Sequence, residues 1–386
     1  MAAERRLLVV CESLGIGGTE SHLLQLLPRI SGLGFKVAIF CLSGRGERAD
    51  GLESKGVEVL SARRMTVGQK SNRRRLPSLA HSTSKLFWFM RRWNPQIAHF
   101  YLPGPYVIGA PIAIAMGIPV KIMSRRSLSD YQQNWPKVAR IERMLHGSMD
   151  ALVANSRAVV AQLTSEGVPE NKIKLIYNGV DMPKPLTNRG AARRALGLDQ
   201  HALIIVVVAN LIHYKGHRDL LRGLGQVARQ LPSPWRLLVV GRDEGLRSNL
   251  EGLARNEGIA DNIQFLGQRP DALRFMAAAD FGVLTSHEEG FSNVIIESMA
   301  AGLAMVVTSV GGNPDAVIEE RTGLLVPPRD PAAIGQAVLR LARDPNLRKA
   351  LGDAGRSRVE REFSIDRCVR AHHDLYQTLL AKRYTD

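Results

Sequence analysis

The sequence predicts an α/β protein built from two doubly wound parallel sheets in tandem. Short, apolar, β-rich runs alternate with helical stretches along most of the 386 residues, the pattern of strands joined by crossover helices. Runs such as 204–208, Ile-Ile-Val-Val-Val, are apolar on both faces, as in parallel strands covered by helices on both sides. The series stops at a proline-containing link, residues 182–186, and then restarts. We therefore expect two Rossmann-like domains.

The candidate strands fall into two groups. The first group lies at residues 7–11, 36–42, 57–60, 97–100, 120–123, 151–154 and 174–177. The second group lies at residues 203–209, 236–240, 263–266, 281–285, 304–308 and 323–326. The last segment reads as a helix over residues 365–382. The predicted domains are accordingly residues 1–183 and 184–364, followed by a C-terminal helix in residues 365–386.

Composition indicates a globular protein in a reducing compartment. Hydrophobic residues make up 45% of the chain, enough for sizeable cores. The three cysteines, Cys11, Cys41 and Cys368, form no CxxC pair, which argues against a disulfide framework and a structural zinc site. We find no secretory signal and no apolar run long enough to span a membrane. The expected location is the cytoplasm.

Positive charge is concentrated in the first half. Residues 1–180 carry a net charge of +13, whereas the remainder carries +3, and no acid occurs between Glu58 and Asp130. This asymmetry predicts an anionic partner for the first domain. Residues 63–93 hold nine Lys or Arg, and residues 82–93 read as a helix with one apolar face formed by Leu86, Phe89, Met90 and Trp93. That face suits either docking at an anionic membrane, on the inner face of the cell membrane, or packing on the sheet.

A glycine loop follows the first candidate strand. Residues 7–11 lead into Gly15-Ile16-Gly17-Gly18-Thr19-Glu20, and residues 21–30 read as a helix. Glycines at such a junction let the backbone approach a phosphate, and the helix N-terminus favours negative charge. The dinucleotide fingerprint G-x-G-x-x-G is not matched, because Glu20 occupies its sixth position.

The second domain carries the most specific pattern. Lys215 follows the strand at 203–209, and Glu289 and Glu297 stand eight residues apart after the strand at 281–285. A loop at the carboxyl edge of a parallel sheet lies where such sheets bind ligands, which places Glu289 there. A helix beginning near Asn293 would present free N–H groups to a diphosphate, with Glu297 one turn further on. Lys215 supplies a positive charge for a departing diphosphate.

Together with residues 155–156 and 177–181, these elements resemble the retaining, two-domain glycosyltransferases called family 4, whose GT-B fold has two Rossmann-like domains facing a cleft. The resemblance covers nearly the whole chain. It implies an acceptor-binding first domain, a second domain that binds a nucleotide-sugar, and a final helix that returns to the first domain. By resemblance Glu297 holds the ribose, Glu289 the donor sugar and Lys215 the phosphates. The implied donor-binding set is Gly15, Gly17, Gly18, Asn210, Lys215, Gly290, Phe291, Ser292, Asn293 and Glu297.

Two positions depart from the family pattern. Asn210 stands where members commonly carry an arginine, which leaves phosphate neutralisation to Lys215, with Arg218 or Arg242 as candidates to assist it. Arg125 or Arg126 stands where many members carry a histidine near the reacting centre. Arginine stays protonated and cannot act as a general base at neutral pH, but it can bind the charge of an acceptor or donor. The candidate catalytic residues are therefore Lys215, Glu289, Arg125 and His99, with a structural histidine as the alternative for His99.

The resemblance implies transfer with retention of configuration from a nucleotide-sugar, with UDP as the commonest base among relatives, to a saccharide or lipid-linked acceptor. We expect no cofactor and no metal, because no Asp-x-Asp motif or zinc-type histidine spacing is present. Two other functions remain open: a sugar-nucleotide epimerase of the same fold and a basic nucleic-acid-binding protein. The second lacks a basic helix-turn-helix, an RNP-type aromatic motif and a zinc finger, so no nucleic acid is expected.

Overall fold

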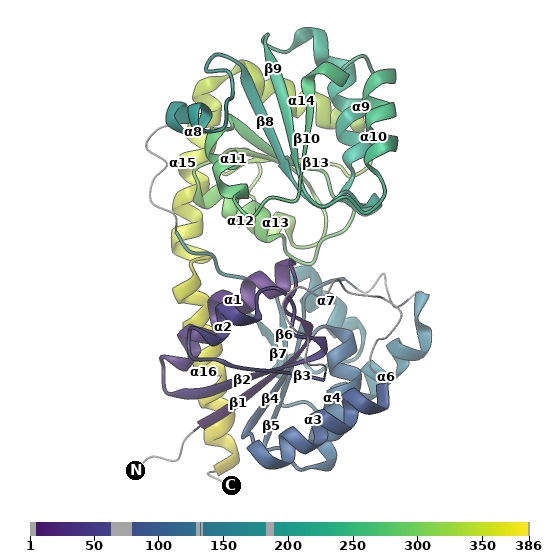
Figure 1. Ribbon diagram of the computed structural model, residues 1–386, viewed down its shortest axis with the longest axis vertical. Helices are drawn as coiled ribbons and strands as arrows, with labels where there is room; N and C mark the ends of the chain where they lie inside the picture. Colours follow the sequence, from purple (N-terminus) through teal and green to yellow (C-terminus); the bar gives the residue numbers. More distant parts are fainter. Residues whose placement is uncertain (1–4, 63–78, 129–131, 133, 183–188, 385–386) are drawn as a thin grey trace. The chain divides into compact units, whose positions relative to one another are not determined.

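A computed structural model describes residues 5–62, 79–128, 132, 134–182 and 189–384 (Figure 1). The chain divides into two compact units, one formed by Met1–Gly179 with Ile365–Asp386 and the other by Val180–Ser364. The first junction thus falls at residues 179 and 180, just before the proline-containing link.

The first unit is built on a seven-stranded sheet in the order β3-β2-β1-β4-β5-β6-β7. Every neighbouring pair is parallel. The order reverses between β1 and β4, and such a switch point opens a crevice at the carboxyl ends of the strands. The strands are β1 (Arg5–Ser13), β2 (Phe35–Gly44), β3 (Glu58–Ser61), β4 (Ile97–Tyr101), β5 (Val120–Arg125), β6 (Ala151–Ala154) and β7 (Ile173–Leu175).

Helices cover both faces of this sheet. One face packs against α1 (Gly18–Ser31), α2 (Ala49–Glu53) and the final helix α16 (Ile365–Tyr384). The other face packs against α3 (Leu79–Trp93), α4 (Pro103–Ala115) and α7 (Arg157–Ser165), while α6 (Pro136–His146) lies against α4 (Figure 1). A short 3-10 turn, η1 (Glu170–Lys172), precedes β7.

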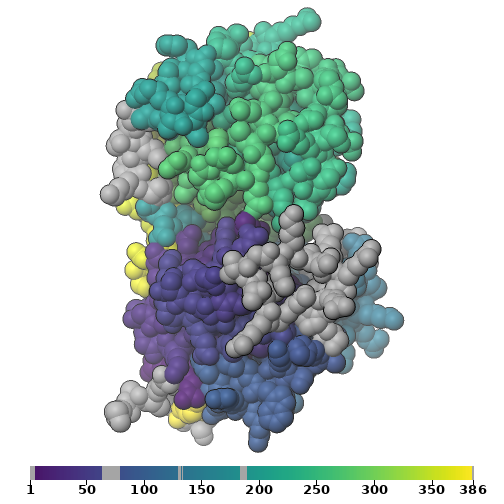
Figure 2. All heavy atoms as spheres, in the orientation of Figure 1, coloured from purple at the N-terminus to yellow at the C-terminus, as the bar shows by residue number. Residues whose placement is uncertain are grey.

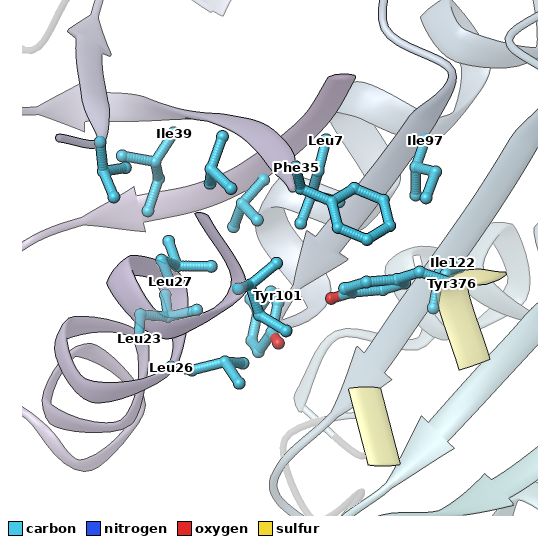
Figure 3. Packing of buried hydrophobic residues seen from close by; sticks show 14 of the residues in the cluster. Leu7, Leu23, Leu26, Leu27, Phe35, Ile39, Ile97, Tyr101, Ile122 and Tyr376 are labelled. Carbon is cyan, nitrogen blue, oxygen red and sulfur yellow. The ribbon is translucent and has the colours of Figure 1, made fainter. Parts of the chain in front are cut away.

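Side chains along β1 point alternately to the two faces of the sheet, and both faces are buried. Leu7 and Val9 enter the core beside α1 and α16, whereas Leu8 and Val10 enter the core on the opposite face. Figure 3 shows the first of these cores, in which Tyr376 of α16 lies beside Phe35 and Ile122. The last helix in the sequence therefore completes the hydrophobic core of the first unit.

The second unit is built on a six-stranded parallel sheet in the order β10-β9-β8-β11-β12-β13. Its switch point lies between β8 and β11. The strands are β8 (Leu203–Val208), β9 (Trp235–Val240), β10 (Ile263–Gly267), β11 (Phe281–Leu284), β12 (Met305–Thr308) and β13 (Leu324–Val326). All thirteen strands predicted from the sequence are present in the described residues, with bounds that agree to within two residues.

The helices of the second unit pack in groups: α9 contacts α10 and α14, and α12 contacts α11 and α15. Their bounds are α8 (Arg189–Ala195), α9 (His217–Val227), α10 (Arg247–Asn256), α11 (Ala272–Ala278), α12 (Asn293–Ala300), α13 (Asn313–Ala316), α14 (Pro331–Arg343) and α15 (Pro345–Glu362). The 3-10 turns are η2 (His213–Lys215), η3 (Ala228–Gln230) and η4 (Ala260–Asn262). None of the described helices combines the length and apolar character needed to cross a bilayer.

Candidate active site

Two loops meet at the switch point of the second unit. One follows β8 and contains η2, and the other follows β11 and leads to α12. Gly216 joins them closely: its φ is +66°, and a Cβ there would clash with the Thr285 carbonyl, so only glycine fits. Thr285 Oγ1 donates a hydrogen bond to the Gly216 carbonyl at 3.0 Å, and the backbone N–H of His287 donates to the Tyr214 carbonyl at 2.6 Å. These contacts fix the position of Lys215.

Lys215 and Glu289 form an ion pair between the two loops. Lys215 Nζ lies 2.6 Å from Glu289 Oε1, and the Ser286 hydroxyl donates to the same oxygen at 2.7 Å. The side chains are 18% and 11% exposed, so both are held firmly yet remain in reach of solvent. The structure therefore brings together the two residues that the sequence placed at this sheet edge.

The N-terminus of α12 adjoins this pair. Its N-cap residue, Ser292, makes no side-chain capping bond. Gly290 and Phe291 are buried in front of the helix, and the Phe291 ring lies 5.5 Å from that of Phe363. Glu297 lies one turn into α12 and is half-buried. An anion at this helix end would meet both backbone donors and a positive partial charge.

Asn210 has a structural role that the sequence did not indicate. Its Oδ1 accepts a hydrogen bond from the Arg242 backbone N–H at 3.1 Å, and its carbonyl lies 3.1 Å from His217 Nε2. Burial lowers the pKa of His217 to about 4, so the ring is neutral and donates that bond. Asn210 thus ties the ends of β8 and β9 to the start of α9.

The glycine loop of the first unit lies between β1 and α1. Helix α1 begins at Gly18, with Gly17 as an N-cap that has no side chain to offer. A Cβ on Gly17 would clash with the carboxylate of Glu20, so the loop and the first turn of the helix are closely folded together. The loop thus lies at the carboxyl end of β1, beside the switch point, as the sequence predicts. Gly15 lies in the same loop, between β1 and α1.

His99, predicted as a catalytic or a structural histidine, lies in the core of the first unit, in surroundings that suit the structural alternative. Its side chain is completely buried on β4. Nδ1 lies 2.8 Å from the Tyr376 hydroxyl, and Nε2 lies 2.8 Å from the Ser124 hydroxyl. Both ring nitrogens are therefore occupied inside the protein, and the residue joins the sheet to α16.

The charge of Arg125, a predicted catalytic residue, is neutralised inside the first unit. The fully buried guanidinium donates from Nη1 and Nη2 to the two carboxylate oxygens of Glu166, at 2.9 and 3.1 Å. The Glu142 carboxylate lies 3.6 Å from Nη2. Burial alone would raise the pKa of Glu166, but hydrogen bonds from His146 and Arg125 lower it to about 2. A substrate cannot reach Arg125, and its neighbour Arg126 faces different surroundings, described below.

The apolar face predicted on the helix at 82–93 packs on the sheet. Leu86 and Met90 are fully buried, and Phe89 and Trp93 pack partly against the same core. This face is therefore unavailable to a membrane. Residues 63–78, which carry most of the basic run, lie outside the described residues.

Three buried histidines, His22, His99 and His372, predict that acid destabilises the first unit. Burial lowers the pKa of each, to about 4 for His372. The unfolded chain then binds more protons below pH 6.5, so stability should be complete above that pH and fall towards pH 4, by at most about 1.4 kcal/mol per pH unit for each histidine. Urea unfolding at several pH values between 7.5 and 4.5 measures this slope. His372→Leu should flatten it, whereas the matched change at exposed His201 should not; equal slopes in the two variants would contradict the prediction.

Within the described part of the chain, no group of three His, Cys, Asp or Glu side chains is arranged to hold a metal ion. The three cysteines are all free and buried.

Comparisons with known proteins agree with this architecture. The family described as "Glycosyltransferase Family 4" matches residues 16–183, and that described as "Glycosyl transferases group 1" matches residues 188–358. A D-inositol 3-phosphate glycosyltransferase of Corynebacterium urealyticum is 28% identical over 94% of this chain and 91% of its own. The N-acetyl-alpha-D-glucosaminyl L-malate synthase of Bacillus anthracis is 24% identical over 82% of this chain and 83% of its own.

Solved structures share the fold at lower identity. Anabaena Alr3699/HepE in complex with UDP-glucose has a TM-score of 0.82 at 20% identity, covering 96% of this chain and 99% of that one. The sucrose-phosphate synthase of Thermosynechococcus elongatus has a TM-score of 0.81 at 21% identity, covering 98% and 100%.

Proposed function

The chain belongs to the family 4 glycosyltransferases, also described as glycosyl transferases group 1, and from this premise we propose that it moves a hexose from a UDP-sugar to a hydroxyl of a glycan or lipid-linked acceptor, with retention of configuration. The observation that carries the proposal is the Lys215–Glu289 ion pair beside the N-terminus of α12.

Each donor group has a partner of suitable chemistry. The N–H groups of residues 290–293 and the Lys215 ammonium receive the diphosphate. The Glu297 carboxylate accepts hydrogen bonds from the ribose hydroxyls, and Glu289 accepts them from the sugar. In the first unit, Gly15, Gly17 and Gly18 let the backbone approach a phosphate closely. The solved complexes of Alr3699/HepE with UDP and UDP-glucose support the choice of base.

The proposed chemistry is a front-side displacement. The bond between the anomeric carbon and the diphosphate oxygen breaks as the acceptor oxygen attacks from the same face, and the departing diphosphate takes the acceptor proton. Lys215 and the helix end stabilise the charge that develops on the leaving group, where fixed donors have their largest effect. Glu289 is already paired with Lys215, so we assign it to sugar binding and propose no covalent intermediate.

Nucleotide release tests donor and metal together. The protein is incubated with UDP-, GDP- or ADP-glucose and a mixture of saccharide acceptors, with and without EDTA. Release is expected with the UDP-sugar, at a rate that EDTA leaves unchanged, because Lys215 and backbone donors supply the positive charge that a metal supplies elsewhere. Loss of activity in EDTA with recovery in Mg²⁺ or Mn²⁺ would show that a metal is required. Absence of release from all three donors would contradict the proposed donor class.

We also propose that the enzyme works in the cytoplasm, peripherally on the anionic inner face of the cell membrane. The support comes from the outer surface of the layer formed by α3, α4 and α6. Trp88, Trp135 and Met144 there are 64%, 63% and 72% exposed. The basic residues exposed among them are Arg91, Arg92, Lys137, Arg140 and Arg143. We call these eight residues the basic–apolar face.

Among the described residues, the helices that form this surface expose no acidic side chain. Helices α3 and α4 contain no Asp or Glu, and the one acid of α6, Glu142, is fully buried beside Arg125. In Figure 2 the stretch that contains α3 and α4 is blue, and its atoms form part of the molecular surface. Basic residues beside exposed tryptophans suit the headgroup region of an anionic leaflet, where each is worth about 1 kcal/mol.

Vesicle co-sedimentation tests the membrane proposal. Binding is expected to vesicles of mixed neutral and anionic phospholipid at low salt, to be weak on neutral vesicles, and to fall steeply at high salt because ions screen the attraction. The triple variant Arg91→Glu, Arg140→Glu, Arg143→Glu should lose binding. A control of equal net charge, Arg222→Glu, Arg229→Glu, Arg274→Glu, alters exposed residues of the second unit and should keep most of it. Equal binding by both variants would rule out the basic–apolar face.

A further inference from the structure

Two adjacent arginines at the end of β5 have opposite surroundings. Arg125 is neutralised by Glu166 and Glu142. Arg126 is 9% exposed, and among the described residues the carboxylate in its electrostatic range is that of Glu20, with which it forms no ion pair. Its Nη2 donates to Asn178 Oδ1 at 2.7 Å, and its guanidinium lies 5.8 Å from the centre of the Tyr101 ring. A buried guanidinium with one neutral acceptor and one ring is incompletely compensated.

The groups around Arg126 do not supply the missing charge. His22, His99 and His372 lie in this region of the first unit and are kept neutral by burial, which lowers the pKa of each. The nearest carboxylate in electrostatic range is Glu20, in the first turn of α1. Its carboxylate folds against Gly17 and not onto Arg126. The guanidinium thus retains unused donors close to the glycine loop.

We propose that Arg126 binds a negatively charged group of the acceptor, a phosphate or a carboxylate, and thereby selects anionic acceptors. This inference rests on the proposed transferase function and deepens it. Arg126 belongs to the first unit, which carries the excess of positive charge, whereas Lys215 of the second unit serves the donor diphosphate. A planar guanidinium pairs with phosphate or carboxylate through two parallel N–H···O bonds. A bound anion would therefore accept the hydrogen bonds that no protein group accepts from Arg126.

The first consequence concerns stability without substrate. Arg126→Met removes an uncompensated buried charge and should leave the melting temperature unchanged or raised, because no carboxylate loses its partner. A melting temperature lowered as much as in Arg125→Met would show that Arg126 is a structural residue, and would overturn the inference.

The second consequence uses inorganic phosphate and succinate as separate probes. Either anion, added with saturating UDP so that the donor diphosphate site is filled, should raise the melting temperature of the wild-type protein saturably, by on the order of 5 °C at about 100 times its Kd. The rise in melting temperature should vanish in Arg126→Met and persist in Lys215→Ala. In Arg126→Lys, which keeps the charge but loses the paired N–H groups of the guanidinium, it should require at least about tenfold more anion. No response to either anion, or the same response in wild type and Arg126→Met, would overturn the proposal.

Calorimetric titration with UDP separates this inference from the proposed function. UDP should bind wild type and Arg126→Met equally, and a fall of tenfold or more in Arg126→Met would assign the arginine to the donor instead. If UDP binds neither protein while the anion response still depends on Arg126, the donor proposal fails and the anion site stands.

Discussion

A Lys215→Ala variant is expected to transfer sugar about 10²–10³ times more slowly than the wild type while remaining folded. The Lys215 ammonium is positioned before any ligand arrives, by its 2.6 Å contact with Glu289 and by the close packing of Gly216 on Thr285. A fixed positive charge stabilises the leaving diphosphate without reorganisation during the reaction. Because this interaction strengthens as the bond breaks, the loss should fall on kcat more than on KM.

Initial rates of nucleotide release under saturating donor measure the effect. Lys215→Arg keeps the charge at a different geometry and should recover part of the rate. Arg222→Ala, an exposed residue of α9 in the same unit, serves as the matched control and should match the wild type. Wild-type turnover in a folded Lys215→Ala protein would remove Lys215 from the reaction.

The Arg125→Met variant is expected to lose about 3–5 kcal/mol of unfolding free energy, the usual cost of removing one partner of a buried ion pair. Glu166 would keep its contacts with His146 and Gln132, and Glu142 would remain buried beside an apolar side chain. The three elements that meet at Arg125, namely β5, α6 and the end of α7, would lose the charge that joins them.

Urea unfolding followed by tryptophan fluorescence measures this loss. Arg45→Met is the control, since Arg45 also contacts two carboxylates, Asp50 and Glu53, but these are 71% and 42% exposed. Solvent screens that pair, so its removal should cost no more than about 1 kcal/mol. An Arg125→Met protein of unchanged stability but abolished transfer would restore the catalytic role that the sequence suggested.

Local patterns in the sequence determined the secondary structure and much of the donor site. Apolar runs such as 204–208 are continuous because their strands are buried on both faces, so every one of the strands could be found. Glu289 and Lys215 could be placed at one sheet edge because residues that follow parallel strands meet at the carboxyl ends. Each residue could be placed because it follows shortly after a strand that the sequence predicts.

Tertiary structure alone decided which charged side chains are free to act. Arg125 and Arg126 are identical and adjacent, and only the positions of Glu142, Glu166 and Asn178, far away in sequence, distinguish them. His99 likewise meets Tyr376 across 277 positions of chain. On α3 the sequence showed one apolar face but not that the sheet would bury it, which leaves Trp88 and the basic residues outside. Whether a charged side chain is buried or paired depends on contacts between residues far apart in the sequence. A local sequence pattern therefore does not predict it.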